Sequence, residues 1–155
     1  MISMLDYHVY AELMRIRSRS DQPYQVGCMI STKDNLIAAR GYNTEVSEEL
    51  QWVENYAIMK ATRAYPAEYP VYYGEIVHAE AMALARLSEH TSDCTMYCTL
   101  EPCVPCAEYV INSGRVVEFR YLWDYASERK HKAHLFESGV PLIKSAGIKV
   151  GRIKV

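Results

Sequence analysis

The chain has 155 residues, of which 50% are hydrophobic and 23% are charged, and its formal net charge is -2 at pH 7. This length and composition predict a single globular domain over residues 1–155, and the mild acidity argues against long nucleic acids as partners. No stretch reaches the roughly 20 apolar residues of a membrane helix, and the opening residues are too polar for a signal peptide, so we expect no membrane partner and a cytoplasmic location.

The hydrophobic pattern alternates between helical and strand periodicity along the chain. Leu5, Val9, Leu13 and Ile16 recur at helical spacing in the first segment, whereas short apolar runs between turn residues mark strands. In chain order we expect a helix over 4–17, a hairpin of strands over 25–32 and 36–43, helices over 49–64 and 78–87, a strand over 94–100, a helix over 102–112, a strand over 116–123, a helix over 128–137 and a short strand within 147–155. This alternation predicts an α/β fold with three α/β/α layers, in which a mixed sheet of about five strands carries helices on both faces.

Two short motifs carry the residues that we expect to do chemistry. They are His78-Ala79-Glu80 and Pro102-Cys103-Val104-Pro105-Cys106, and each lies at the start of a predicted helix. Cysteines at positions i and i+3 point the same way from one helical turn, and an imidazole from a neighbouring helix adds a third zinc ligand. We therefore predict that His78, Cys103 and Cys106 bind Zn²⁺, with the fourth position left for water.

Glu80 is expected to be the general acid and base, and not a metal ligand. A carboxylate at this position can take a proton from the attacking water, deliver it to a ring nitrogen and carry another proton to the departing amine. Each motif alone has a second interpretation, because a lone Cys-x-x-Cys is also typical of a redox pair and a lone His-x-Glu occurs by chance. A closed structural zinc site would need a fourth Cys or His, which the spacing does not offer.

The remaining cysteines are expected to be structural. Five cysteines, two of them in Cys-x-x-Cys, favour metal or redox chemistry in a reducing compartment over a disulfide framework. Cys28, Cys94 and Cys98 fall in predicted strands, where a free cysteine is usually a small buried hydrophobe.

In this order the two motifs form the signature of zinc deaminases, and the chain resembles the cytidine-deaminase superfamily, most of all deoxycytidylate deaminases, over nearly its whole length. Further segments carry the resemblance: Arg19-Ser20, Gln25-Val26-Gly27, Gly41-Tyr42-Asn43, Val77, Met96-Tyr97, Ser113-Gly114 and Ser138-Gly139-Val140. The resemblance implies hydrolysis of dCMP to dUMP and ammonia, with attack at C4 of cytosine and a small-molecule nucleotide as the partner.

The same resemblance implies which residues bind the nucleoside. Asn43 corresponds to the asparagine that hydrogen-bonds the sugar, Tyr125 to the aromatic stacked on the base, and Val26 to the pocket wall. The Ala79 N–H and the Glu101 carbonyl correspond to the backbone groups that read the ring edge. Two alternatives stay open, since Asn43 can instead cap a turn after a strand and Tyr125 can be a packed core aromatic.

The phosphate and effector sites are less well defined by the motifs. The resemblance places Arg19 or Ser20 on the phosphate, and Arg17 competes for this role. Relatives continue Gly-Tyr-Asn with Gly and a Pro-containing turn associated with a dCTP activator, whereas this chain has Thr44-Glu45-Val46. Acidic residues in this segment would repel a triphosphate unless Mg²⁺ or arginines offset their charge, so Mg²⁺ is expected only with a dCTP effector. A homo-oligomer, often a hexamer in the relatives, is also implied.

Three other functions are compatible with the same motifs. The first is deamination of another small amine, such as deoxycytidine, dCTP, a modified deoxycytidylate or a guanine-like base. The second is base editing on a polynucleotide, which the absence of a basic stripe disfavours. The third is a nucleotide-binding or interaction module in which zinc is purely structural.

Overall fold

The computed structural model describes residues 4–45, 76–128 and 137–155. The described elements are α1 (Met4–Arg17), β1 (Gly27–Ser31), β2 (Ile37–Tyr42), β3 (Thr44–Glu45), β4 (Ile76–Val77), α3 (Ala79–Arg86), β5 (Cys94–Leu100), α4 (Val104–Ser113), β6 (Val116–Trp123), α5 (Val140–Ser145) and β7 (Lys149–Arg152). The expected helix over 49–64 lies outside the described residues, as does nearly all of the one over 128–137.

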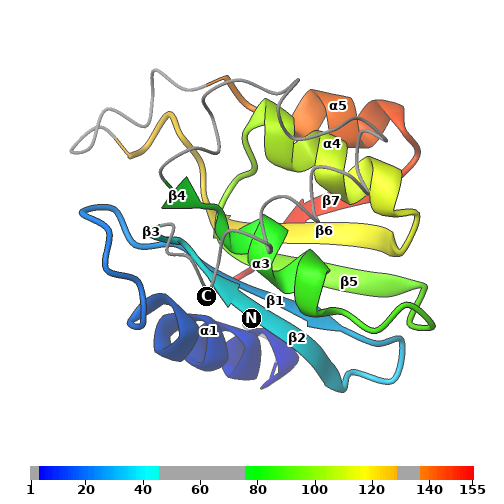
Figure 1. Cartoon of the computed structure of the whole chain (residues 1–155), viewed down its shortest axis with the longest axis horizontal. Coiled ribbons are helices and arrows are strands. Elements are labelled where there is room, and N and C mark those ends of the chain that lie inside the picture. Colours follow the sequence, from blue (N-terminus) through cyan, green and yellow to red (C-terminus); the bar gives the residue numbers. More distant parts are fainter. Residues whose placement is uncertain (1–3, 46–75, 129–136) are drawn as a thin grey trace.

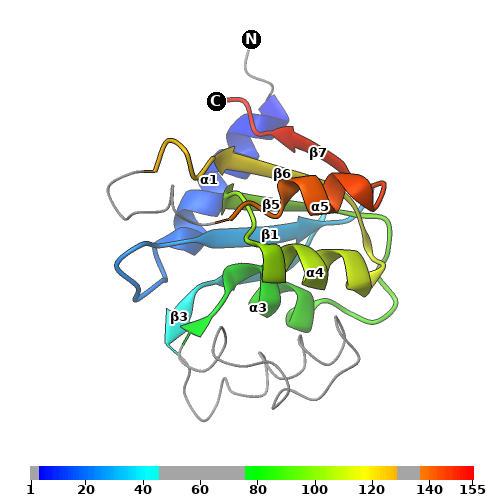
Figure 2. The same ribbon diagram turned by 90° about the horizontal axis from the view of Figure 1, so that it is seen from above.

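The main sheet has five strands in the order β2-β1-β5-β6-β7. β1 runs antiparallel to β2 and β5, whereas β5, β6 and β7 are parallel to one another, so the sheet is mixed as predicted. Of the described helices, α1 covers one face, and α3, α4 and α5 lie over the other (Figure 1). Seen from above, these three helices lie side by side across the sheet (Figure 2). The predicted three-layer α/β/α fold is therefore confirmed.

Alternating residues of the strands supply the two cores. Met29 and Tyr97 pack with Leu13 of α1 on one face of the sheet. Their neighbours along the strands, Ile30 and Met96, pack in the cluster beneath α3 and α4 on the other. Side chains of successive strand residues point to opposite faces, so both faces of these central strands must be apolar. This explains why β1 and β5 read as nearly continuous apolar runs in the sequence.

Three short elements were not predicted, the helix α5 and the strands β3 and β4. α5 has six residues, too few to show a helical apolar pattern, although Pro141 lies in its first turn, where a proline is well tolerated. β3 and β4 form a separate two-stranded ladder in which Thr44 pairs with Val77. This ladder leads directly into His78 and α3, so it helps to place the start of that helix.

None of the helices in the described residues combines the length and hydropathy that a membrane span requires.

Candidate metal and substrate site

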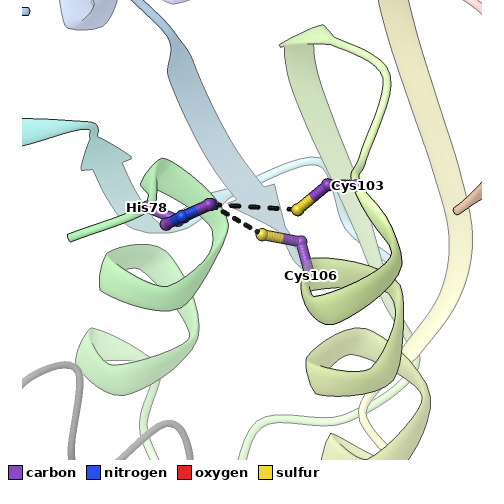
Figure 3. Close-up of side chains that lie close together, drawn as sticks. All are labelled: His78, Cys103 and Cys106. Atoms are coloured by element: carbon purple, nitrogen blue, oxygen red, sulfur yellow. Dashed lines mark hydrogen bonds between the residues drawn. The ribbon is translucent and has the colours of Figure 1, made fainter. Parts of the chain in front are cut away.

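The two sequence motifs come together at the N-terminal ends of α3 and α4. His78 is the N-cap of α3, Cys103 is the N-cap of α4, and Cys106 lies in the first turn of α4. The Nδ1 atom of His78 is 3.3 Å from Sγ of Cys106 and 3.9 Å from Sγ of Cys103 (Figure 3). All three ligand atoms lie within 4.8 Å of one another. This spacing suits one metal ion, since zinc binds nitrogen and sulfur at about 2.0–2.3 Å.

Neither His78 nor Cys103 uses its side chain to cap its own helix. The N-terminus of a helix also carries unsatisfied N–H groups and a partial positive charge, which stabilise a thiolate. The two helix starts therefore present an imidazole and two thiols to the same point.

The two thiols differ in how readily they ionise. Hydrogen bonds from Cys106 and His78 lower the pKa of Cys103 to about 5. Burial, and then the neighbouring Cys103 sulfur, raise the pKa of Cys106 well above its usual value. The site thus holds one negative charge easily and resists a second, so a divalent cation would be needed to keep both sulfurs as thiolates. The donor set and its charge fit Zn²⁺, which prefers sulfur and imidazole ligands.

Glu80 lies buried beside the thiols, one residue into α3. It is 6% exposed, and its carboxylate is in hydrogen-bonding contact with Cys106. Burial first, and then the charge of Cys103, raise the pKa of Glu80. A carboxyl group held closer to neutrality in this way can both accept and donate a proton.

Tyr125 and Val26 lie on the neighbouring side of the site. Tyr125 follows the carboxyl end of β6, is 6% exposed and packs in a cluster with Leu100, against which Val26, Tyr24 and Trp123 also pack. Burial raises the pKa of the Tyr125 phenol, and the charges of Cys103, Glu80 and Cys106 raise it further. Tyr24 and Trp123 were not singled out in the sequence, although each stands within two residues of one that was.

The Asn43 side chain is engaged with the loop that precedes β1. Its Oδ1 accepts hydrogen bonds from the Ser20 hydroxyl at 2.6 Å and from the Val26 N–H at 2.8 Å. Its Nδ2 donates to the Tyr24 carbonyl oxygen at 2.8 Å. Asn43 therefore orders the loop, and the second N–H of its amide is the group left to reach a ligand.

The two arginines that are candidates to bind the phosphate, Arg17 and Arg19, have different surroundings. Arg17 at the end of α1 donates from Nε to the Gln25 carbonyl oxygen at 3.0 Å, and its guanidinium lies 5.2 Å from the Trp123 ring centroid. Arg19 is exposed, whereas Ser20 is buried and bonded to Asn43. The structure thus holds the Arg17 guanidinium against the Trp123 ring.

Ala79 and Glu101 flank the metal cluster through the backbone. Ala79 is the first residue of α3, where helix N–H groups lack partners within the helix. Glu101 follows β5, immediately before Pro102 and Cys103, and its N–H donates to the Trp123 carbonyl oxygen at 2.9 Å. Both positions adjoin the ligands in space.

This three-layer α/β/α fold, built on a mixed sheet, brings His, Cys and Cys together at two adjacent helix starts. That is the arrangement of a zinc-binding deaminase domain. Residues 3–122 match the family model described as the cytidine and deoxycytidylate deaminase zinc-binding region. The chain belongs to this family, which confirms the resemblance that the motifs indicated.

Similar proteins agree with this assignment. A probable deoxycytidylate deaminase from Caenorhabditis elegans is 35% identical over 107 residues, which cover 66% of this chain and 49% of that protein. Another from Drosophila melanogaster is 31% identical over 135 residues, covering 83% of this chain and 64% of that protein. The chain thus spans about half to two thirds of the length of these relatives. The apo crystal structure of dCMP deaminase from the cyanophage S-TIM5 shares the fold, with a TM-score of 0.64 and 17% identity over 98% of this chain and 99% of that one.

Proposed function

We propose that this protein is a zinc-dependent hydrolase that converts dCMP to dUMP and ammonia. The observation that carries the proposal is the closeness of His78 Nδ1 and the two sulfur atoms, within 4.8 Å, next to the buried carboxylate of Glu80. Membership of the deaminase family and relatives bearing the name deoxycytidylate deaminase support it. We assign His78, Cys103 and Cys106 as the zinc ligands.

In this proposal Glu80 moves the protons. A zinc ion held by the three ligands would supply a Lewis acid that makes water more acidic. The Glu80 carboxylate accepts a proton as the water oxygen bonds to C4 of cytosine, and returns it to the adjacent ring nitrogen. It then carries the remaining proton to the exocyclic nitrogen, whose bond to C4 breaks to release ammonia. The raised pKa of Glu80 favours this delivery, because its protonated form is then more populated.

The neighbouring groups would hold the nucleoside. Tyr125 and Val26 would provide an apolar wall for the base, and the free N–H of Asn43 would donate to the sugar. The Ala79 N–H and the Glu101 carbonyl oxygen would bind the ring edge, since a small polar ring needs paired hydrogen bonds as well as a stacking face.

The phosphate assignment follows from the arginine geometry. We propose that Arg17 binds the substrate phosphate. Its guanidinium lies over the Trp123 ring, and Trp123 packs against the same cluster as Tyr125. Ser20 is placed to support this region through Asn43, and Arg19 is assigned a lesser part. A cytoplasmic location, a homo-oligomer and an Mg²⁺-dependent dCTP effector stay predictions from the sequence.

A substrate panel tests the proposal. Purified protein with measured zinc content is incubated separately with dCMP, deoxycytidine, dCTP, guanine and a single-stranded oligonucleotide, and released ammonia is measured. We expect dCMP to be turned over with the highest kcat/KM. Turnover of deoxycytidine or guanine without dCMP would contradict the substrate but keep the chemistry. Turnover of none of them, together with unfolding on chelation, would indicate a structural zinc site.

A further inference from the structure

The side chain of Glu101 bridges two segments on either side of the proposed site. Its Oε1 accepts a hydrogen bond from the Tyr125 N–H at 2.5 Å, and its Oε2 accepts one from the Ser138 hydroxyl at 2.5 Å. Glu101 is only 8% exposed. The proposed reaction uses only the backbone carbonyl of Glu101, so the buried carboxylate has no role in it so far.

Each bridged segment touches the site directly. Tyr125 belongs to the apolar wall described above. Ser138 pairs with Cys103 in an isolated antiparallel bridge, and the next residue, Gly139, donates its N–H to the Pro102 carbonyl oxygen at 2.8 Å. A Cβ atom at Gly139 would lie 2.5 Å from the Cys103 carbonyl oxygen, so this segment is packed tightly against a metal ligand. The Glu101 carboxylate thus connects Tyr125, which belongs to the proposed apolar wall for the base, to the Ser138-Gly139 segment, which packs against Cys103.

A buried carboxylate is costly unless hydrogen bonds satisfy it, and bonds to an ionised acceptor are stronger than neutral ones. The two donors arrive from different elements, one after β6 and one before α5. The backbone of residue 101 is also fixed, through its N–H to Trp123. These contacts make residue 101 the rigid link to which both segments are attached.

We infer that the Glu101 carboxylate is a positioning residue: it holds Tyr125 and the Ser138-Gly139 segment at a fixed place relative to Cys103, and so sets how the substrate base meets the site. This inference rests on the proposed function for its kinetic consequences. The hydrogen bonds themselves can be tested without it.

The kinetic test compares Glu101→Ala with Glu101→Gln. The alanine variant loses both hydrogen bonds and is expected to raise KM for dCMP about tenfold, with a smaller fall in kcat and unchanged zinc content. The glutamine amide can accept from the Tyr125 N–H and donate to the Ser138 oxygen, so this variant should stay within about threefold of wild type. Glu118→Ala, which removes a carboxylate from β6 that pairs with Lys149, is the matched control.

A double-mutant cycle separates positioning from general destabilisation. Because the bond to Ser138 is still lost, Glu101→Ala added to Tyr125→Ala should raise KM about threefold, instead of the roughly tenfold expected in the wild-type background. Fully additive effects on KM would overturn the inference. Should Glu101→Ala fail to fold, Ser138→Ala removes one of the two bonds and is expected to raise KM about threefold; an unchanged KM in that variant would also overturn it.

Hydrogen exchange keeps this inference distinct from the substrate proposal. Peptides that contain the Tyr125 amide should exchange at least about tenfold faster in Glu101→Ala than in Glu118→Ala, whichever amine the protein deaminates. Unchanged exchange at Tyr125 in a protein that turns over dCMP would overturn the positioning role alone. Faster exchange at Tyr125 in Glu101→Ala, together with no activity of the wild type on dCMP, would support the positioning role of Glu101 and contradict only the proposed substrate.

Discussion

Gly41 in β2 lies directly against the backbone of Ala79, the first residue of α3. A Cβ atom at position 41 would overlap the Ala79 carbonyl oxygen and would lie 2.6 Å from the Ala83 backbone nitrogen. Backbone atoms of a helix cannot move aside as the end of a flexible side chain can. The close approach of β2 and α3 therefore depends on the missing side chain, and with it the position of His78 and Glu80.

Gly41→Ala is accordingly expected to displace α3. We expect a loss of about 1–3 kcal/mol in the free energy of unfolding and weaker zinc retention, because the added methyl group forces α3 away from the sheet. Thermal or denaturant unfolding and metal analysis measure the two effects. Gly151→Ala is the control, since a Cβ there meets no heavy atom of the described residues within 4 Å, and its stability should change by no more than about 0.5 kcal/mol. Equal effects of the two substitutions would contradict the packing argument.

Glu80→Gln should separate catalysis from metal binding. Glutamine has nearly the same shape but cannot accept and return a proton, so we expect zinc to stay bound while kcat falls by about a hundredfold or more. Zinc content and ammonia release from dCMP are measured on the same preparation. Glu118→Gln on β6 should leave both unchanged. A Glu80→Gln variant with near-normal turnover would refute the acid–base role.

Cys106→Ser should empty the metal site. It removes a thiolate whose sulfur lies 3.3 Å from His78 Nδ1, and two remaining protein ligands hold zinc poorly. We expect zinc to fall well below one ion per chain and the Tm to become insensitive to chelator, whereas chelator lowers the Tm of the wild type. Cys94→Ala, at a buried thiol outside the cluster, should cost some stability and keep its zinc. Full zinc occupancy in Cys106→Ser would exclude Cys106 as a ligand.

Much of this architecture could be predicted because its residues act locally. The apolar runs of β5 and β6 have the bounds predicted for them, and Cys103 and Cys106 must share a face of α4 because they are one turn apart. Cys28 and Cys98 are fully buried, as expected for small apolar residues, and lie opposite each other on paired strands.

The rest depends on contacts between distant segments. The sequence was compatible with two roles for Asn43, a hydrogen bond to the sugar or a cap on a turn. Its hydrogen bonds with Ser20, Tyr24 and Val26 show that most of its amide orders a loop. The carboxylate of Glu101 meets Tyr125 and Ser138 through the packing of β6 and α5, which no local pattern encodes. The short helix α5 itself has too few residues for periodicity to reveal it.

Asn43→Ala should therefore impair both the loop and substrate binding. It removes three hydrogen bonds, and we expect a loss of about 1–3 kcal/mol in stability together with a rise in KM for dCMP of about tenfold or more. Calorimetry and steady-state kinetics check the two parts. Asn112→Ala is the control, because that amide donates to the Glu108 carbonyl oxygen within the exposed part of α4. A stability loss with KM unchanged would show that Asn43 serves the loop alone.

Arg17→Gln tests the phosphate assignment, since the two candidate arginines differ in their surroundings. The Arg17 guanidinium lies over Trp123, whereas Arg19 is exposed. If Arg17 meets the phosphate, Arg17→Gln should raise KM for dCMP about tenfold and leave KM for deoxycytidine, which has no phosphate, within about twofold. The deoxycytidine measurement also controls for the lost contact with Trp123, because any displacement of that wall would affect both substrates. Arg19→Gln is the matched variant, with less than about a threefold effect expected on either substrate; a larger and dCMP-selective effect there would move the phosphate contact from Arg17 to Arg19.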